Sequence, residues 1–382
     1  MLKKATIFSL VVFSLFGEAK RPGAVFLTIW PGSRPTALGG TFTAVADDAS
    51  AAYYNPGGLS FLKGVSITGN HVPWLPGLWP DMYYDYLSIT APVGNKGVIA
   101  FHTIYLNTGK TDVVLPDGRV LPSYTTFDIS PGIAYGYKVN EKLGVGGAVK
   151  LIYSFLVPKW VWEELREYLQ TPVREGGTGI TWAVDWGILY KPSKELSIGI
   201  NLQNMGPGIS YVKGAEPDPL PLLLRIGFKF EPVHNQLFKL MFTSDFTKIL
   251  VGMFADVDSL EIKPGEYKVN PSTWDKISYE ISDVWRGFGI ELGYYDMLFL
   301  RVGYFYDKTG WRGGIFINDG SNTYHISLID FIRGDYTGRY EKIGLTYGAG
   351  IKLGTFQFDF GIDENIYDFP TTNRKFSLTY TF

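Results

Sequence analysis

The chain has 382 residues, a net charge of −2, no cysteine, and 16% aromatic residues, with 45 glycines. The lack of cysteine excludes thiol catalysis, disulfide bonds and thiolate metal sites. The near-neutral charge, without a basic stripe, leaves no electrostatic footprint for nucleic acid.

Met1–Ala19 has the pattern of a secretory signal peptide. A positive start, Lys3-Lys4, precedes the apolar run Ala5–Phe16 and a small-x-small cleavage site at Gly17-Glu18-Ala19. We expect an exported mature chain that begins at the next lysine; the alternative is a buried first helix. No later stretch has the ~18 consecutive apolar residues of a membrane helix. An exported chain of this kind is either soluble or a barrel.

A segment rich in small residues follows, from Arg34 to Gly64, with too much glycine for one long helix. Short helical turns are expected at Thr43–Ala46 and Asp48–Tyr53. Asp47 or Asp48 would cap the second turn, and Asn55-Pro56-Gly57-Gly58 would end it, because proline cannot continue a helix. A compact, weakly charged segment needs a container to pack inside.

Alternating strands are expected throughout residues 65–382. In the last, Phe376, Leu378 and Tyr380 share one face and polar residues the other, the period of a strand with two unlike faces. The pattern predicts fourteen strands, near 65–72, 83–93, 97–107, 124–138, 143–156, 178–191, 196–205, 221–231, 236–247, 286–295, 298–307, 340–353, 355–365 and 374–382.

The connections between these strands alternate between short turns and long loops. The long ones are 73–82, 108–123, 157–177, 206–220, 248–285, 308–339 and 366–373. Such alternation with an even strand number predicts an all-β fold, a transmembrane antiparallel β-barrel of about 14 strands, which must close because lipid offers no hydrogen bonds. A large soluble β-sandwich is the alternative. The aromatic last strand ending in Phe382 resembles the ending of outer-membrane barrels and favours the barrel.

The two faces of the expected strands differ in chemistry. Inward-facing charges would be costly in hydrocarbon but can pair with one another, with the N-terminal segment or with water in a lumen. They are Lys150, Asp185, Arg225, Lys229, Glu291, Arg301, Asp359 and Asp363. We expect ion pairs that lock the segment to the wall; a polar conduit for a permeant is the alternative. Outward-facing aromatics for membrane-interface girdles are Tyr135, Tyr137, Trp182, Trp186 and Tyr190.

Two outer loops are unusually apolar, which favours a partner, a ligand or a lipid interface. One is the proline-stiffened run His71–Pro80, and the other is an amphipathic helix expected at Trp160–Gln170. The helix is either a cap on the barrel rim or a binding element. The candidate cargo or ligand contacts are Trp74, Leu75, Leu78, Trp79, Trp160, Trp162 and Leu165.

Catalytic and cofactor patterns are missing from the sequence. The four histidines lack metal-ligand spacing, and Gly58–Leu62 lacks the final glycine of the G-x-S-x-G hydrolase motif. We therefore expect no enzyme, no cofactor and no metal site.

The block from Leu38 to Leu59 resembles the N-terminal signature shared by FadL-type outer-membrane barrels and their PorV/PorQ relatives. The residues that carry this resemblance are Leu38, Gly39, Gly40, Asp47, Asp48, Asn55, Pro56 and Gly57. It implies that residues 20–64 fold as a plug in the lumen of a FadL-like 14-stranded barrel formed by residues 65–382, in the cell outer membrane of a Gram-negative bacterium.

Three further blocks resemble the PorV family of the type IX secretion system. They are Phe26–Arg34, Ser244–Leu250, and the strand pair Gly287–Tyr294 with Leu298–Tyr306. That resemblance implies a barrel in outer-membrane lipid that binds secreted cargo carrying a C-terminal signal domain. It would hand this cargo from the translocon to an attachment complex, with the loops near Trp74–Pro80, Trp160–Gln170 and Val251–Trp285 as contacts.

One departure limits the PorV resemblance, because Asp47–Leu59 is closer to the general FadL/PorQ form. The alternative function is therefore a FadL-like transporter. Its outer loops would capture a hydrophobic small molecule and release it past a moving plug.

Overall fold

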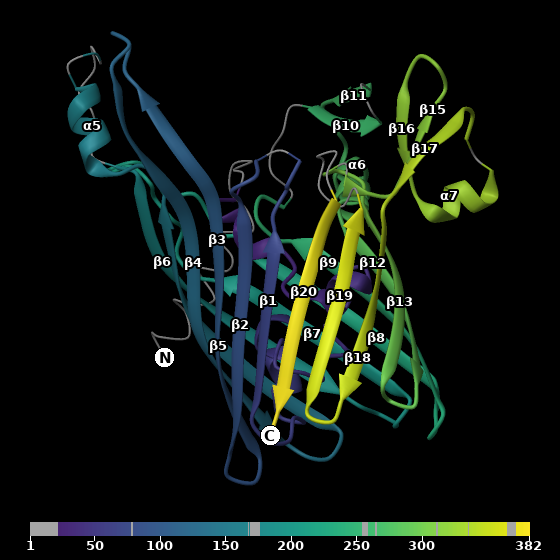
Figure 1. The fold of residues 1–382 in the computed structure, drawn as a ribbon. Coiled ribbons are helices and arrows are strands. Elements are labelled where there is room, and N and C mark those ends of the chain that lie inside the picture. The colour runs from purple at the N-terminus through teal and green to yellow at the C-terminus, as the bar shows by residue number, and fades with distance from the viewer. Residues whose placement is uncertain are drawn as a thin grey trace.

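The computed structural model describes residues 22–77, 79–166, 168, 176–253, 259–263, 266–310, 312–334, 336–364 and 372–382. The signal peptide expected at residues 1–19 lies outside them. Figure 1 shows an antiparallel barrel with short turns at one end, long connections at the other, and the N-terminal segment of the described residues running inside it. Among the described residues, no helix is both long and apolar enough to span a membrane.

Fourteen strands form the closed barrel, and each pairs antiparallel with the next along the ring. They are β1 (Ser66–Pro73), β2 (Tyr83–Val93), β3 (Gly97–Val114), β4 (Val120–Lys138), β5 (Leu143–Phe155), β6 (Thr178–Tyr190), β7 (Leu196–Met205), β8 (Leu223–His234), β9 (Phe238–Ile249), β12 (Trp285–Tyr294), β13 (Leu298–Asp307), β18 (Leu345–Leu353), β19 (Phe356–Glu364) and β20 (Thr372–Thr381). β1 and β20 close the ring, with Thr68 opposite Thr379 and their hydroxyls 2.9 Å apart. The fold expected from the strand rhythm is confirmed.

Side chains alternate between the outside and the inside of the wall. Along β6, Ile180, Trp182 and Trp186 are exposed, whereas Ala183 and Asp185 between them are buried. Because successive side chains of a strand point to opposite faces, the wall presents mainly apolar residues outward. Its inward face carries small and polar residues and, toward the long connections, larger apolar ones. The five aromatics expected for the girdles are all exposed on the outer face.

Two expectations about strand extent were wrong. The segment 108–123, expected as a loop, continues β3 to Val114 and starts β4 at Val120, with bulges that bend the long hairpin. The strand expected at 340–353 is two strands, because β17 (Arg339–Ile343) leaves the barrel to pair with β15. The break falls at Gly344, where the backbone crosses Gly313 and Gly314 too closely for a Cβ and donates to the Gly314 carbonyl at 2.6 Å.

The long connections, expected from the sequence to be mostly loops, contain further short helices and strands. They are α5 (Lys159–Leu165), β10 (Ser259–Lys263), β11 (Glu266–Val269), α6 (Thr273–Ser282), β14 (Arg312–Gly313), β15 (Ile315–Asn318), β16 (Thr323–Ile326) and α7 (Leu328–Arg333). β15 pairs with both β16 and β17, and α7 follows β16. We call β15, β16, β17 and α7 the outer unit.

The N-terminal segment contains η1 (Val25–Thr28), α2 (Ser33–Ala37), α3 (Ala51–Tyr54) and α4 (Pro56–Leu59). Thr43–Ala46 forms a turn closed by one bond from the Ala46 amide to the Phe42 carbonyl, and is not helical. The Asn-Pro pair begins α4 as well as ending α3, because the Asn55 side chain accepts from the Gly57 amide and proline suits the first helical position. The sequence pattern did not predict that the Asn-Pro pair begins a helix.

Candidate functional site: the barrel interior

The N-terminal segment fits between inward-facing backbone from many strands. α2 packs against β18 and β19, and α4 packs against β4, β5 and β6. Leu38, Gly40, Asn55, Pro56 and Gly57 of the signature are buried, Asp48 is half-buried and Asp47 is exposed. Contacts around the ring therefore hold the segment within the barrel.

Gly39 marks a close approach of the segment to the wall. Its φ is +72°, and a Cβ there would lie 2.6 Å from the Tyr304 carbonyl oxygen and 2.7 Å from that of Phe288. Both the positive φ and the contact demand glycine. The Gly39 amide also donates to the Thr346 hydroxyl at 2.9 Å, which ties this point of the segment to β18.

Asn55 connects two parts of the segment to β6. Its amide nitrogen donates to the carbonyls of Thr43 at 2.8 Å and Ile188 at 2.9 Å, while its oxygen accepts from Gly57 at 3.0 Å. A buried amide with these bonds satisfies its donors. Asn55 is therefore a structural tie between the Thr43 turn, α4 and the wall.

Asp245 of β9 holds the turn that begins at Phe42. One carboxylate oxygen accepts from the amides of Phe42 and Thr43, each at 3.0 Å, and from the Thr43 hydroxyl at 2.7 Å. Asp245 was not among the site residues expected from the sequence. The inward alternation of β9, in which Lys239, Met241 and Thr243 precede it, is the signal that would have found it.

A network of ion pairs joins the segment to the wall near the short turns. Arg34 contacts Glu291 of β12 at 2.8 Å and Asp47 at 2.6 Å. Arg301 of β13 contacts the same Glu291 at 2.7 Å and Asp359 of β19 at 2.7 Å. Lys239, also missed, lies 3.0 Å from Glu291. The one glutamate is thus shared by three cations.

The other lumen charges lie in further pairs and contacts. Lys150 pairs with Asp185 at 2.7 Å, and Lys229 pairs with Glu231 at 3.0 Å. Arg225 lies over the rings of Tyr53 and Tyr54. Lys375 lies 3.5 Å from Asp363 and donates to the Trp30 carbonyl at 2.8 Å. Among the described residues, Glu231 also lies 4.0 Å from Lys239 and so extends the Glu291 network, whereas the Lys150 and Lys375 pairs stand apart from it.

A cavity of about 600 Å³ lies beside the ion-pair network, toward the short turns. Arg34, Asp47, Lys239 and Arg301 line one part of it, and Phe382 lines another. Because Asp296 and Gly354 of two short turns also line it, the cavity lies at the short-turn end of the barrel, and we call it the inner vestibule.

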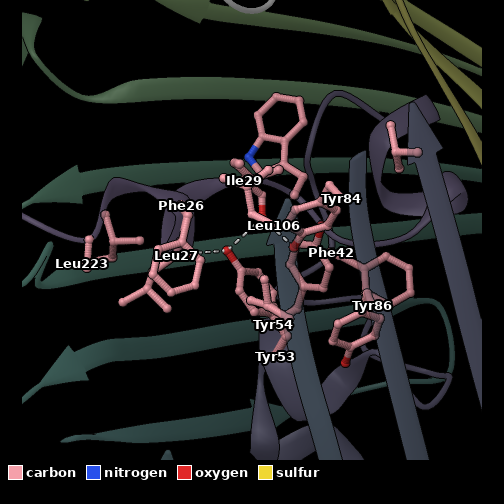
Figure 2. Packing of buried hydrophobic residues seen from close by; sticks show 14 of the residues in the cluster. Phe26, Leu27, Ile29, Phe42, Tyr53, Tyr54, Tyr84, Tyr86, Leu106 and Leu223 are labelled. Atoms are coloured by element: carbon pink, nitrogen blue, oxygen red, sulfur yellow. Dashed lines mark hydrogen bonds between the residues drawn. The ribbon is translucent and has the colours of Figure 1, made fainter. Parts of the chain in front are cut away.

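An apolar layer fills the barrel between the segment and the long connections. Its members include Phe26, Leu27 and Trp30 of the segment, with Tyr84, Leu106 and Phe305 of the wall. Figure 2 shows Phe26 and Leu27 of η1 near Tyr53 of α3 and Tyr84 of β2. The Tyr53 hydroxyl donates to the Leu27 carbonyl at 2.8 Å. The interior toward the long connections is therefore mainly apolar, with Lys375 and Arg225 buried within it. The end near the short turns holds the ion-pair network and a smaller apolar cluster that includes Leu59 and Val98.

Two of the outer-loop contacts expected from the sequence belong to this apolar layer. Trp74 and Leu75 are only 5% and 6% exposed, because Trp74 packs on Tyr84 and the Leu75 amide donates to Asn373. The expectation that they lie on the surface was wrong. Trp79 is exposed at 49%, and Leu78 lies outside the described residues.

The helix expected at Trp160–Gln170 is described as α5, which ends at Leu165; residues 167, 169 and 170 lie outside the description. Val161 is buried and Trp160, Trp162 and Leu165 are half-buried. Trp160 packs edge-on against Tyr124 of β4. Trp162 lines a second cavity of about 550 Å³ with Tyr211 and Val212.

Comparison with known proteins finds likeness in structure only. No protein-family model matches the chain. No curated protein matches it. The toluene transporter TodX of P. putida aligns over 97% of this chain and 99% of its own, with 13% identity and a TM-score of 0.52. The toluene transporter TbuX of Ralstonia pickettii aligns over 92% and 98%, with 13% identity and a TM-score of 0.51.

The chain has the fold of these toluene-transporter barrels. A TodX variant described as a monoaromatic hydrocarbon channel aligns similarly, over 92% of this chain and 99% of its own, with 13% identity and a TM-score of 0.50. At this identity the likeness concerns the fold alone, and it agrees with the antiparallel barrel of about 14 strands expected from the strand pattern.

Proposed function

We propose that this protein carries small hydrophobic molecules across the outer membrane, which was the alternative function in the sequence analysis. The observation that carries the proposal is the apolar layer inside the outer end of the barrel, built from Phe26, Leu27, Trp30, Trp74 and Phe305. A lumen for hydrophilic solutes would present polar side chains at this depth. An apolar permeant gains by leaving water for such surroundings.

The N-terminal segment is the closure in this proposal. Its apolar residues complete the layer on the outer side, and Arg34 anchors it on the inner side through Glu291 and Asp47. A molecule that enters the layer replaces contacts between the segment and the wall. The permeant leaves when the segment shifts and opens a route past the ion-pair network to the inner vestibule.

The fold supports this proposal as an analogy. The two neighbours named above are toluene transporters, and function must be argued from the site because one fold hosts many functions. The permeants that fit an aromatic and aliphatic layer are small apolar molecules, and monoaromatic hydrocarbons are the first class to test.

Uptake of radiolabelled toluene by cells that express the barrel tests this function. We expect faster uptake of toluene than in cells with the empty vector, and equal uptake of a polar sugar. Insertion of the folded barrel is checked by its heat-modifiable mobility on a gel. A folded barrel with unchanged toluene uptake would contradict transport of this class.

A second candidate is the PorV-like role, in which the outer surface docks secreted cargo. The observation that favours it is exposed apolar surface on α6, where Trp274 and Ile281 are 78% and 61% exposed. Such surface favours a partner. Its partners would be the type IX translocon, the attachment complex and cargo with a C-terminal signal domain.

A gentle-detergent pull-down of the tagged barrel from its native membrane separates the two candidates. Mass spectrometry of the proteins and of the lipid extract reports both kinds of partner. Stoichiometric secreted proteins that share one C-terminal domain would support docking. An enriched hydrophobe without protein partners would support transport. In a separate test, deletion of α5 without loss of cargo export would show that this helix is not part of the docking surface.

A further inference from the structure

The outer unit lies against the outside of the barrel wall. The outward-facing residues of β13 are exposed at Leu300 and Val302 but buried at Tyr304 and Tyr306. The cover is the outer unit together with Tyr336, which lies between α7 and β17, and their apolar residues share one cluster with the two tyrosines. They are Ile315, Ile317, Ile326, Leu328, Phe331, Tyr336 and Ile343. Figure 1 shows α7 displaced to the side of the barrel.

The height of this contact follows from the length of β13. The strand has ten residues and starts at a short turn, and a tilted strand needs about 9–11 residues to cross the hydrocarbon core. Its last outward residues, Tyr304 and Tyr306, therefore lie at the outer boundary of the core. The outer unit sits at the same boundary, directly above the lipid-facing Leu300 and Val302.

The short helix α7 is apolar on two sides. Leu328 and Phe331 pack into the cluster with the tyrosines. Ile329 and Ile332 point away from it and are 61% and 74% exposed, with the exposed Arg333 beside them. A surface helix normally carries one apolar stripe toward its core and polar residues outside. The second apolar side is unexplained by packing within the described chain.

We propose that α7 is seated in the outer surface of the membrane, with Ile329 and Ile332 among the lipid acyl chains. The lipid is the occupant because the exposed side of α7 continues the lipid-facing strip of β13 at the height where the hydrocarbon ends. Arg333, at the end of the helix, would reach the phosphate region, as long basic side chains do at membrane interfaces. The outer unit would then fix the depth of the wall at β12 and β13.

Single cysteines test this seating directly, because the chain has no cysteine of its own. Ile332→Cys would carry a nitroxide label in vesicles of phosphatidylethanolamine and phosphatidylglycerol. The label collides with oxygen, which concentrates in lipid, and with a nickel chelate, which stays in water. The ratio of the two collision rates shows whether the label lies in lipid or in water. Val302→Cys on the wall is the lipid reference. Val120→Cys at the start of β4 is the water reference, because Val120 and Ile332 are both 74% exposed.

We expect the oxygen-to-nickel collision ratio at position 332 to be several-fold above that at 120 and near that at 302. Ile329→Cys should give the same result independently. A ratio at 332 equal to that at 120 would overturn the proposal. A label that is free in vesicles but shielded from both reagents in native membrane fragments would also overturn it, and would assign this side of α7 to a protein partner.

Discussion

Arg34 of the N-terminal segment and Glu291 of β12 form a buried ion pair, with Nε and Oε2 2.8 Å apart. Arg301 contacts the same carboxylate oxygen at 2.7 Å, and Lys239 contacts the other at 3.0 Å. Glu291 therefore neutralises cations from the segment and from two strands of the wall. Its removal would affect the wall and the closure together.

Glu291→Gln should lower the free energy of unfolding by about 3–5 kcal/mol, because removing one partner leaves buried cations uncompensated. The measurement is urea unfolding in lipid vesicles, followed by tryptophan fluorescence. Glu141→Gln is the control, since Glu141 pairs with Lys138 in an exposed turn and its loss should leave stability unchanged. Equal effects of the two substitutions would contradict a central role for Glu291.

Asn55→Ala should destabilise the barrel by about 2–4 kcal/mol, because three buried hydrogen bonds are lost at about 0.5–1.5 kcal/mol each. Two of these bonds connect the Thr43 turn and β6 to the start of α4. Limited proteolysis of folded barrels measures how readily the N-terminal segment detaches from the wall. Asn95→Ala, in the exposed turn between β2 and β3, should leave the cleavage rate unchanged. If the segment stays protected from cleavage in Asn55→Ala, Asn55 is not needed to hold the segment to β6.

Gly39→Ala should prevent the segment from docking, and Gly94→Ala should be tolerated. Both glycines have positive φ, +72° and +63°, so both substitutions carry similar backbone strain. Only at Gly39 would the new methyl group meet the Tyr304 and Phe288 carbonyls, because nothing lies within 4 Å of a Cβ at Gly94. Refolding yield by heat-modifiable gel mobility checks this pair. Equal yields would show that the close approach at Gly39 is not needed.

The barrel was predictable from the sequence because lipid outside and a filled lumen inside impose a period of two on every strand. What failed depended on contacts between distant segments. Nothing local marks Gly344 as the point where a continuous alternation leaves the wall, and that break becomes visible only when Gly313 and Gly314 lie beside it. Trp74 was expected among the contacts of an exposed outer loop, yet it packs inward against Tyr84.

The PorV-like blocks illustrate a different limit of sequence reasoning. Asp245 in one block holds the amides of Phe42 and Thr43, and Glu291 and Arg301 in another belong to the network around Arg34. These residues hold the N-terminal segment, which is a task shared by any barrel closed in this way. Such blocks therefore indicate the fold and leave cargo docking and transport equally open.

Movement of the segment during transport is the central claim, and a reversible cross-link tests it most directly. The hydroxyls of Ser33 in α2 and Ser377 in β20 lie 2.8 Å apart, a spacing that suits a disulfide between cysteines at these positions. The variant Ser33→Cys/Ser377→Cys would hold the segment to the wall when oxidised. Thr68→Cys/Thr379→Cys is the matched control, because those hydroxyls, 2.9 Å apart, join two strands of the wall.

Toluene uptake is then measured in cells that express each pair, before and after reduction. The account predicts that uptake through the Ser33–Ser377 pair is lost on oxidation and restored by reduction, while the Thr68–Thr379 pair transports equally in both states. Undiminished uptake through a fully oxidised Ser33–Ser377 pair would contradict the account.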